Sequence, residues 1–415
     1  MLPDIRTSLP GPKSRVLAAR LRSVEGANVT FLPVDESFPI FWQRGDGCLI
    51  TDEDGNKLLD MTAAFGVSAL GHGPTAATIA LTEQCERLVH GMGDVHPTRA
   101  KLELCEALCD LSALEGAKVL LGTSGGDAVE AAIKSAVLRT GKRRVVAFDG
   151  GYHGLNLGAL NATARTDFRY PFQRHLADFV THLPYGEPIH ALPDDTAAVL
   201  VEVIQGRGGV RKASTEWLLN LRALCNEHGA LLIVDEVFTG FWRTGEVFAH
   251  RHHGVIPDII ACGKILGGGM PISACIGSGD AMSGWPVSTG ESIHTSTFLG
   301  HPGGCAAALA TLAVLSQMDA GSVVNRLGAY LRVGLETLAK RHPDQIVTIR
   351  GKGLMYGIQM NAPGAAVSVS DALLQRGVIT LPAGNGDVLE LTPPFVVTPQ
   401  QLDFVIDALD QTLTS

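Results

Sequence analysis

One lysine stands where an ordinary surface lysine is not expected. Lys264 ends an apolar run and opens a glycine-rich loop, in IIACGKILGGGMP. A lysine between a buried strand and a run of glycines is partly withdrawn from water. Its amine then loses its proton more readily and becomes a nucleophile that can form imines. A solvated surface lysine is the ordinary alternative, but this context favours a reactive amine.

A carboxylate follows a neighbouring apolar run. Asp235 comes directly after five apolar residues in ALLIVDEVFTG. A carboxylate buried at a strand end needs a charge or a hydrogen-bond donor as its partner. A helix cap or an internal salt bridge would satisfy that need. The sharper interpretation is that Asp235 pairs with a protonated pyridine nitrogen, which makes the ring an electron sink.

A glycine-rich turn, GTSGGD, runs from Gly122 to Asp127 between an expected strand and an expected helix. Free backbone N–H groups and the helix dipole favour an anion such as phosphate at that place. By itself such a turn is often only a tight turn. The sequence contains no GxxxxGK[ST], and the GxGxxxG that begins at Gly351 lies between two strand-like runs. A nucleotide site is therefore not indicated.

Composition limits the partners of the chain. A net charge of -9 without a run of Lys or Arg argues against nucleic acid and membrane surfaces and favours a small substrate. The eight cysteines are scattered without CxxC, so we expect neither a zinc site nor disulfides, and reduced thiols indicate a cytoplasmic protein. The cluster His250, His252, His253 could bind a metal, but a polar loop explains it and no metal is predicted. No secretory signal or membrane span is expected.

The elements that position these residues follow from alternating patterns. Short β-rich runs such as KVLLG, RRVVAFD and ALLIVDEV alternate with amphipathic helical stretches. This predicts an α/β fold, with a mostly parallel sheet that carries helices on both faces. Ligands bind beyond the carboxyl ends of such strands, where Lys264, Asp235 and Glu202 collect. We expect a large domain over 66–300, and a smaller α+β domain from 1–65 and 301–415.

The motifs together resemble the class III, or ω-, aminotransferases, which are pyridoxal 5'-phosphate (PLP) enzymes of fold type I. The resemblance extends over nearly the whole chain, with the motifs in the family's order. They are GPKSR, DxDGxxxLD at Asp52 to Asp60, LGHGP at Leu70 to Pro74, SGGDAVEAAIK, GGYHG, EVIQGRGG, DEVFTGFWRTG, GKILGGGMP and HTSTFLGHP.

The resemblance implies a role for each matching residue. Lys264 would hold PLP as a Schiff base and move the substrate proton, while Asp235 would keep the pyridinium proton. Tyr152 would stack on one face of the ring and Val237 would pack on the other. Thr297 would reach the phosphate in the neighbouring subunit of a homodimer. The implied cofactor contacts are Ser124, Gly125, Gly126, Tyr152, His153, Glu202, Asp235, Val237, Lys264 and Thr297.

Three positions depart from family members that act on γ-aminobutyrate or ornithine. Leu155 and Glu390 stand where those relatives carry arginines, and Arg207 stands where they carry an acid. Arg207 and Glu390 could form the expected ion pair with its ends exchanged. Because arginine is the usual clamp for a carboxylate, either a simple amine or an amino acid held by Arg207 remains open as substrate. The candidate pocket residues are Trp42, Phe65, Leu155, Arg207, Trp242 and Glu390.

The sequence therefore predicts a homodimeric PLP aminotransferase. It would move an amino group from a small amine or amino acid to an oxo acid by a ping-pong mechanism. A racemase, epimerase or aminomutase of the same fold would use the same cofactor residues and stays open at this point. A catalytically silent PLP-binding or interaction protein is the alternative from another class, and it would require the reactive lysine to have no chemical role.

Overall fold

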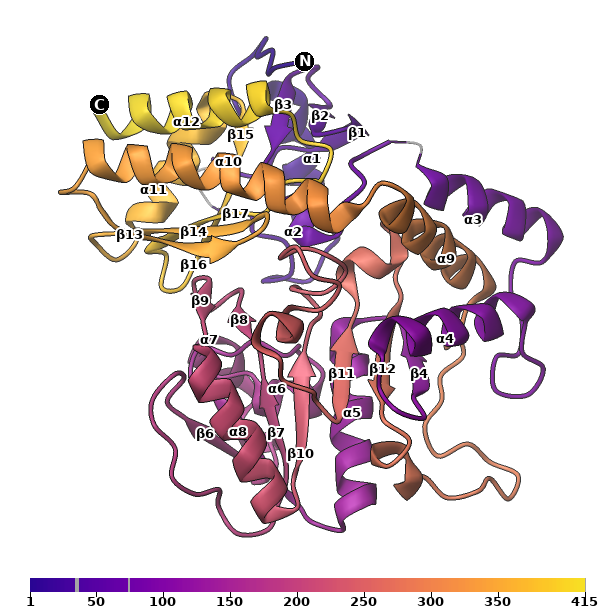
Figure 1. Cartoon of the computed structure of the whole chain (residues 1–415). Coiled ribbons are helices and arrows are strands. Elements are labelled where there is room, and N and C mark those ends of the chain that lie inside the picture. The colour runs from indigo at the N-terminus through magenta and orange to yellow at the C-terminus, as the bar shows by residue number, and fades with distance from the viewer. Residues whose placement is uncertain (34–36, 74, 415) are drawn as a thin grey trace. The chain divides into compact units, whose positions relative to one another are not determined.

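The computed structural model describes residues 1–33, 37–73 and 75–414, so Pro74 of the LGHGP motif lies outside the described residues. The chain divides into two compact units (Figure 1). Unit 1 combines Met1–Thr75, Arg326–Arg350 and Leu354–Ser415, while unit 2 consists of Ala76–Asn325 and Gly351–Gly353.

A seven-stranded sheet forms the centre of unit 2. In spatial order its strands are β4 (Lys118–Gly122), β12 (Ser273–Gly277), β11 (Ile259–Cys262), β10 (Leu231–Asp235), β7 (Thr196–Val201), β5 (Arg144–Phe148) and β6 (Val180–Leu183). Neighbouring strands from β11 to β6 are parallel, and β12 runs antiparallel to both β11 and β4. The expected α/β fold with a mostly parallel sheet is confirmed. The edge strand β6 was not predicted.

Helices cover both faces of this sheet. Helix α5 (Gly125–Thr140) packs its buried alanines, such as Ala132, against Leu200 and Ile233 of the strands. On the other face lies α8 (Thr215–His228), whose Trp217 contacts the ring of Phe148 with 4.9 Å between centroids. Side chains alternate between the two faces along a strand, so strands covered on both sides are apolar at nearly every position.

Unit 2 also contains shorter elements and three further α-helices that pack on one another. Helix α9 packs against α3 and α4, so it belongs to unit 2 and not to the smaller domain in which the sequence analysis placed it. The remaining elements are α3 (Ala76–Arg87), α4 (Arg99–Ser112), α6 (Leu157–Ala162), α7 (Thr166–Arg169), η1 (Tyr170–His175), β8 (Ile204–Gln205), β9 (Arg211–Lys212), η2 (Ala249–His253), η3 (Lys264–Gly267), η4 (Ala281–Gly284) and α9 (Pro302–Gln317).

Unit 1 is built from both ends of the chain around two four-stranded sheets. One sheet has the order β1 (Trp42–Asp46), β2 (Leu49–Asp52), β3 (Lys57–Asp60), β15 (Val378–Ile379). The other has the order β13 (Ile346–Lys352), β14 (Met355–Met360), β17 (Val388–Leu391), β16 (Leu381–Ala383). The helices are α1 (Pro12–Arg22), α2 (Ala63–Gly66), α10 (Ala320–Arg341, which begins in unit 2), α11 (Ala365–Gln375) and α12 (Pro399–Thr414).

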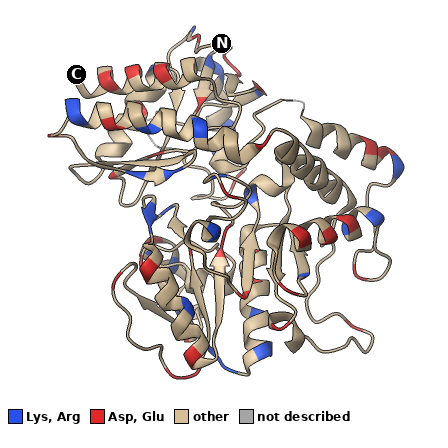
Figure 2. Cartoon of the chain, in the orientation of Figure 1, with Lys and Arg blue, Asp and Glu red and all other residues tan. Residues whose placement is uncertain are grey.

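Acidic and basic residues are interspersed along the surface helices. Figure 2 shows both signs of charge on α8 and on α10, where Arg332 and Glu336 form an ion pair one helical turn apart. Mixed charges of this kind are typical of solvated helix faces. Within the described residues, no single helix has the length and apolar character of a membrane span, and only the bent pair α9 with α10 meets that test jointly.

The hairpin between β2 and β3 depends on one buried carboxylate. Asp52 Oδ1 accepts from the backbone N–H groups of Asp54 at 3.0 Å and Asn56 at 2.8 Å, and Oδ2 accepts from Asn56 Nδ2 at 2.8 Å. Gly55 takes the left-handed conformation with φ +86°, which favours glycine. The chain therefore turns at Asp54-Gly55, and the Asp52 carboxylate holds this turn.

Replacing this carboxylate should destabilise unit 1. Asp52→Ala leaves buried N–H groups of the turn without their acceptor, so we expect the free energy of unfolding to fall by about 2–3 kcal/mol. Chemical denaturation of the variant measures this loss. Glu53→Ala removes the neighbouring, partly exposed carboxylate and should change the free energy of unfolding by less than about 0.5 kcal/mol. Equal losses in the two variants would contradict the assigned role of Asp52.

Candidate active site

The predicted site residues of unit 2 gather at one edge of its sheet. Polar segments follow β4, β5, β7, β10 and β11, which share one direction. Their carboxyl ends therefore meet at the same edge. The segments contribute Ser124 after β4, Tyr152 and His153 after β5, Glu202 after β7, Asp235 after β10 and Lys264 after β11.

The start of α5 is a capped helix that leaves two donors available. Ser124 Oγ accepts from Asp127 N at 3.2 Å, and Asp127 Oδ2 accepts from the backbone N–H groups of Thr123 and Ser124 at 2.9 and 3.0 Å. Partial burial raises the pKa of Asp127, but these hydrogen bonds prevail and lower it, so the cap stays ionised. In the described part of the chain, the N–H groups of Gly125 and Gly126 have no acceptor, as an anion cradle requires.

Glycine at position 125 is required by its neighbour. A Cβ on Gly125 would lie 2.9 Å from Cγ1 of Val237, which is closer than side-chain carbons approach. Val237 follows Asp235 at the end of β10, so the anion cradle and the carboxylate strand meet at this contact. The sequence resemblance placed Val237 against the ring of the cofactor. Its closeness to the cradle is compatible with that position.

Asp235 is buried and holds a histidine. Its Oδ2 lies 2.8 Å from His153 Nδ1, and its Oδ1 accepts from Val237 N at 3.0 Å. The two side chains are 5 % and 1 % exposed, so the pair is shielded from solvent. Burial alone would lower the pKa of His153, but the hydrogen bond and charge of Asp235 outweigh it and raise the pKa. A carboxylate has about four acceptor positions, so Asp235 keeps capacity for a further donor.

Glu202 lies beside this pair, and the pKa of its carboxyl group is raised. Its carboxylate accepts from the backbone N–H groups of Tyr152 at 3.1 Å and Gly206 at 3.3 Å. Burial raises the pKa of Glu202 from 4.5 to about 7, and the negative charge of Asp235 acts in the same direction, while His153 opposes both. Glu202 therefore changes its protonation state near neutral pH, as groups in active sites often do.

Lys264 begins the short helix η3 directly after β11. Its backbone lies in the left-handed region with φ +34°, an uncommon conformation for a residue with a side chain, and Gly268 and Gly269 follow with positive φ. The side chain is half-buried, and Nζ lies 4.3 Å from the centroid of the Phe238 ring. The amine therefore lies at the carboxyl edge beside an aromatic side chain from the segment after β10.

Tyr152 is half-buried next to two arginines. Its ring meets the ring of Phe168 edge-on at 5.7 Å between centroids. Burial raises the pKa of Tyr152, and the positive charges of Arg207 and Arg165 partly offset that rise. Arg165 lies over the Phe168 ring at 5.2 Å. Arg207 lies in the turn between β8 and β9, where no hydrogen bond or ion pair joins it to the described residues of unit 2.

The predicted substrate residues divide between the two units. Leu155 is exposed in unit 2, where Trp242 is half-buried with φ +64°. Trp42, Phe65 and Glu390 belong to unit 1, in which both aromatic side chains are exposed and Glu390 is buried in β17. The exchanged ion pair of Arg207 with Glu390 stays a prediction. Thr297 is exposed in a turn of unit 2, and its role across a subunit interface also stays a prediction.

Sequence reasoning missed the residues that support the site. Thr163 Oγ1 accepts from His153 N at 2.9 Å and donates to Gly154 O, which fixes the GGYHG turn. Gln205 is held by two hydrogen bonds, because its Nε2 donates to Asp149 O at 2.9 Å and its Oε1 accepts from Arg211 Nε at 2.9 Å. No motif marks these contacts, and the bond between Gln205 and Asp149 joins segments 56 residues apart.

This arrangement is that of a PLP-dependent enzyme of fold type I. An amine after one strand, a buried carboxylate after the next and an anion cradle at α5 fit the aldehyde, the ring nitrogen and the phosphate of PLP. The fit does not depend on Lys264 alone, because the cradle donors and the spare acceptor capacity of Asp235 are properties of this chain's own geometry.

Comparisons with known proteins agree with this class. The family model described as aminotransferase class-III matches residues 31–413. The acetylornithine aminotransferase of Methanopyrus kandleri is 37% identical over 379 residues, which are 91% of this chain and 95% of that protein. The structure of an amine transaminase from an uncultivated Pseudomonas species, in a PLP-bound form, is 27% identical with a TM-score of 0.85, covering 94% of this chain and 98% of that one.

The ornithine aminotransferase of Toxoplasma gondii ME49 is also similar, with a TM-score of 0.86 at 27% identity over 96% of this chain and 94% of that one. The family match covers more than nine tenths of the sequence, and the PLP-enzyme site lies within it. The chain belongs to the class III aminotransferases. The predictions of fold type I, of PLP as cofactor and of an aminotransferase are thereby confirmed.

The titration of Glu202 gives a prediction for the protein without PLP. Because folding raises this pKa from 4.5 to about 7, the stability that Glu202 contributes is complete below pH 4.5 and is lost as the pH rises through 7. Glutamine does not titrate. The free energy of unfolding of the unchanged protein should therefore fall, relative to Glu202→Gln, by up to about 3 kcal/mol between pH 4 and pH 8.

Denaturant unfolding at several pH values measures this difference. Glu227→Gln, an exposed position on α8, serves as the control and should show no such trend. A difference between the unchanged protein and Glu202→Gln that is independent of pH would show that the pKa of Glu202 is ordinary.

Proposed function

We propose that this class III aminotransferase uses Lys264 both to hold PLP and to move the substrate proton. PLP, when bound, supplies a carbonyl group that accepts an amine and a ring that withdraws electrons. The Lys264 amine, half-buried at the carboxyl edge, is released when a substrate amine takes its place. It then removes the proton from the substrate carbon that carries nitrogen and returns a proton to complete the transfer. The half-buried lysine at the end of β11 carries this proposal.

Asp235 and its neighbours would set the electronics of the ring. Asp235 is shielded from solvent and retains acceptor capacity, so it would hold a proton on the ring nitrogen. His153 holds the carboxylate in position. Tyr152 would cover one face of the ring and Val237 the other, while Ser124, Gly125 and Gly126 would bind the phosphate.

We further propose that the substrates carry a carboxylate, which Arg207 binds. Arg207 lies close enough to Tyr152 to affect its pKa, and its guanidinium has no hydrogen bond or ion pair within the described residues of unit 2. A guanidinium binds a carboxylate through two parallel hydrogen bonds. Leu155 stands where relatives that act on amino acids carry an arginine, so Arg207 would replace that anchor from another loop.

The active unit would be a homodimer, with Thr297 of one subunit at the phosphate of the other. The exposed turn that contains Thr297 supports this, because the side chain is free to meet a second subunit. The oligomeric state is measured by light scattering, and a single-chain mass with full activity would contradict the proposal. A cytoplasmic location is supported by the eight free thiols, which suit a reducing compartment, and cell fractionation would test it.

Amino transfer distinguishes this function from that of a racemase, epimerase or aminomutase. With PLP bound and one amino acid added, we expect the visible band of the lysine-bound cofactor to disappear and an equivalent of oxo product to form. Added oxo acid should then restore the band. Lys264→Ala should lower the rate of both half-reactions by at least about 10³-fold. A band that persists while the optical purity of the substrate declines would contradict amino transfer.

The role of Arg207 gives a separate prediction. Arg207→Gln should raise KM for oxo acids and amino acids by at least about tenfold, because a charge-assisted pair is lost, while turnover of an amine without a carboxylate stays unchanged. Steady-state kinetics with both donor types measure this. Arg174→Gln removes an exposed arginine of η1 and should leave both values unchanged. Equal losses for both donor types would mean that Arg207 has a structural role.

A further inference from the structure

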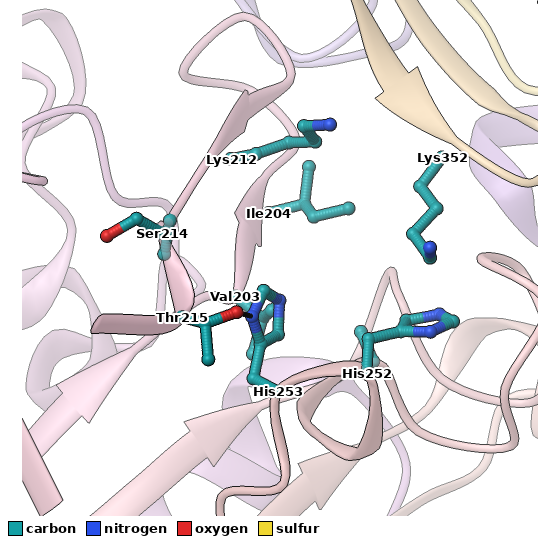
Figure 3. A pocket seen from close by; sticks show the side chains of 10 residues that line it. Val203, Ile204, Lys212, Ser214, Thr215, His252, His253 and Lys352 are labelled. Carbon is teal, nitrogen blue, oxygen red and sulfur yellow. Dashed lines mark hydrogen bonds between the residues drawn. The ribbon is translucent and has the colours of Figure 1, made fainter. Parts of the chain in front are cut away.

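A cavity of about 330 Å³ with several polar lining residues lies in unit 2 (Figure 3). It is bordered by the β8–β9 hairpin, the start of α8 and the short helix η2. Its polar lining residues are Lys212, Ser214, Thr215, His252, His253 and Lys352. None of the lining residues belongs to the proposed PLP or substrate site. From this lining we infer that the cavity binds a phosphate group, as an anion site separate from the α5 cradle.

The lining carries positive charge from two distant parts of the sequence. Lys212 comes from β9 and Lys352 from the end of β13, and Lys212 Nζ donates to the carbonyl of Gly351 at 3.3 Å. This bond holds Lys212 beside the segment that bears Lys352. No carboxylate lies among the described residues that line the cavity. Two ammonium groups in one lining attract an anion.

The positive charge of the lining also affects the pKa values of the two imidazoles. Burial is the first cause that lowers the pKa of His252 and of His253, and the charge of Lys352 lowers both further. Glu246 acts against this at His252, and Glu236 does so at His253. Glu236 is itself buried, and its carboxylate is hydrogen-bonded to His250, which does not line the cavity. The imidazoles therefore stay neutral at neutral pH.

Fixed hydrogen bonds orient both rings. Thr215 Oγ1 lies 2.8 Å from His253 Nδ1, the contact drawn in Figure 3, and a hydroxyl that donates there leaves Nε2–H of His253 as a donor. His252 Nε2 lies 3.1 Å from Thr244 O. The expected loop at these histidines is therefore a short 3-10 helix that presents ordered rings. Figure 3 shows Lys352 pointing toward the imidazoles.

The donor chemistry favours phosphate over a carboxylate. The cationic groups are lysines, which act as point charges toward a tetrahedral anion, and no guanidinium fork is present in the lining to match a planar carboxylate. The start of the 14-residue helix α8 adds its dipole to the same side. The volume lies at the lower end of the range for small-molecule pockets, about 300–1,000 Å³, which admits a phosphate with its water.

Calorimetric titration of the PLP-loaded enzyme with inorganic phosphate at low ionic strength tests this site. We expect one saturable binding event, and binding weaker by about tenfold in Lys212→Gln and in Lys352→Gln. Lys340→Gln makes the same charge change on an exposed turn of α10 and should bind as the unchanged enzyme does. The visible absorption of PLP should be the same in all four proteins, since none of these residues belongs to the proposed cofactor site.

Each of the following results would overturn the inference. One is the absence of saturable phosphate binding to the loaded enzyme. Another is equal affinity in both lysine variants and in the Lys340→Gln control. The third is binding that is lost in Arg207→Gln, since phosphate would then occupy the proposed substrate site. Acetate titrated in the same way should bind at least about tenfold more weakly, and equal binding would contradict a phosphate site. These outcomes do not depend on whether amino transfer is observed.

Discussion

The buried carboxylate of Asp235 is the constraint on which the site of unit 2 depends. A charge at the end of a central strand is costly to bury unless hydrogen bonds and an opposite charge compensate it. His153 supplies both from the end of β5, and the backbone of Val237 supplies a second donor. The spacing of β5, β7 and β10 in the sheet sets where these groups meet. Burial raises the pKa of Glu202, and the negative charge of Asp235 raises it further.

The first turn of α5 forms both the helix cap and the anion cradle. Asp127 and Ser124 take up the N–H groups that the first turn would otherwise leave unpaired, but not those of the two glycines. Val237 fills the space beside Gly125, so a residue with a side chain does not fit at position 125. The glycines therefore satisfy two needs: access for an anion, and close packing of α5 against the segment after β10.

The central sheet could be predicted because its strands are buried on both faces and read as continuous apolar runs. The edge strand β6, VTHL, is only half-buried and carries polar residues, so no such run marks it. Helix α9 is apolar all round, and its position in the chain suggested the smaller domain. Its packing against α3 and α4 depends on the tertiary structure and cannot be inferred from its composition.

Lys264, Asp235 and Glu202 were found because each follows an apolar run. Thr163 and Arg211 were not, because no apolar run or motif marks them. Lys212 and Lys352 were not, because Lys212 contacts a segment 139 residues further along the chain.

The most direct test of this account is to identify the residue that binds PLP. The loaded enzyme is reduced with sodium borohydride, which fixes the bond between PLP and its lysine, and the peptides are examined by mass spectrometry. The account predicts that Lys264 alone carries the added phosphopyridoxyl mass. An unmodified Lys264, with the added mass on another lysine such as Lys212 or on none, would contradict it.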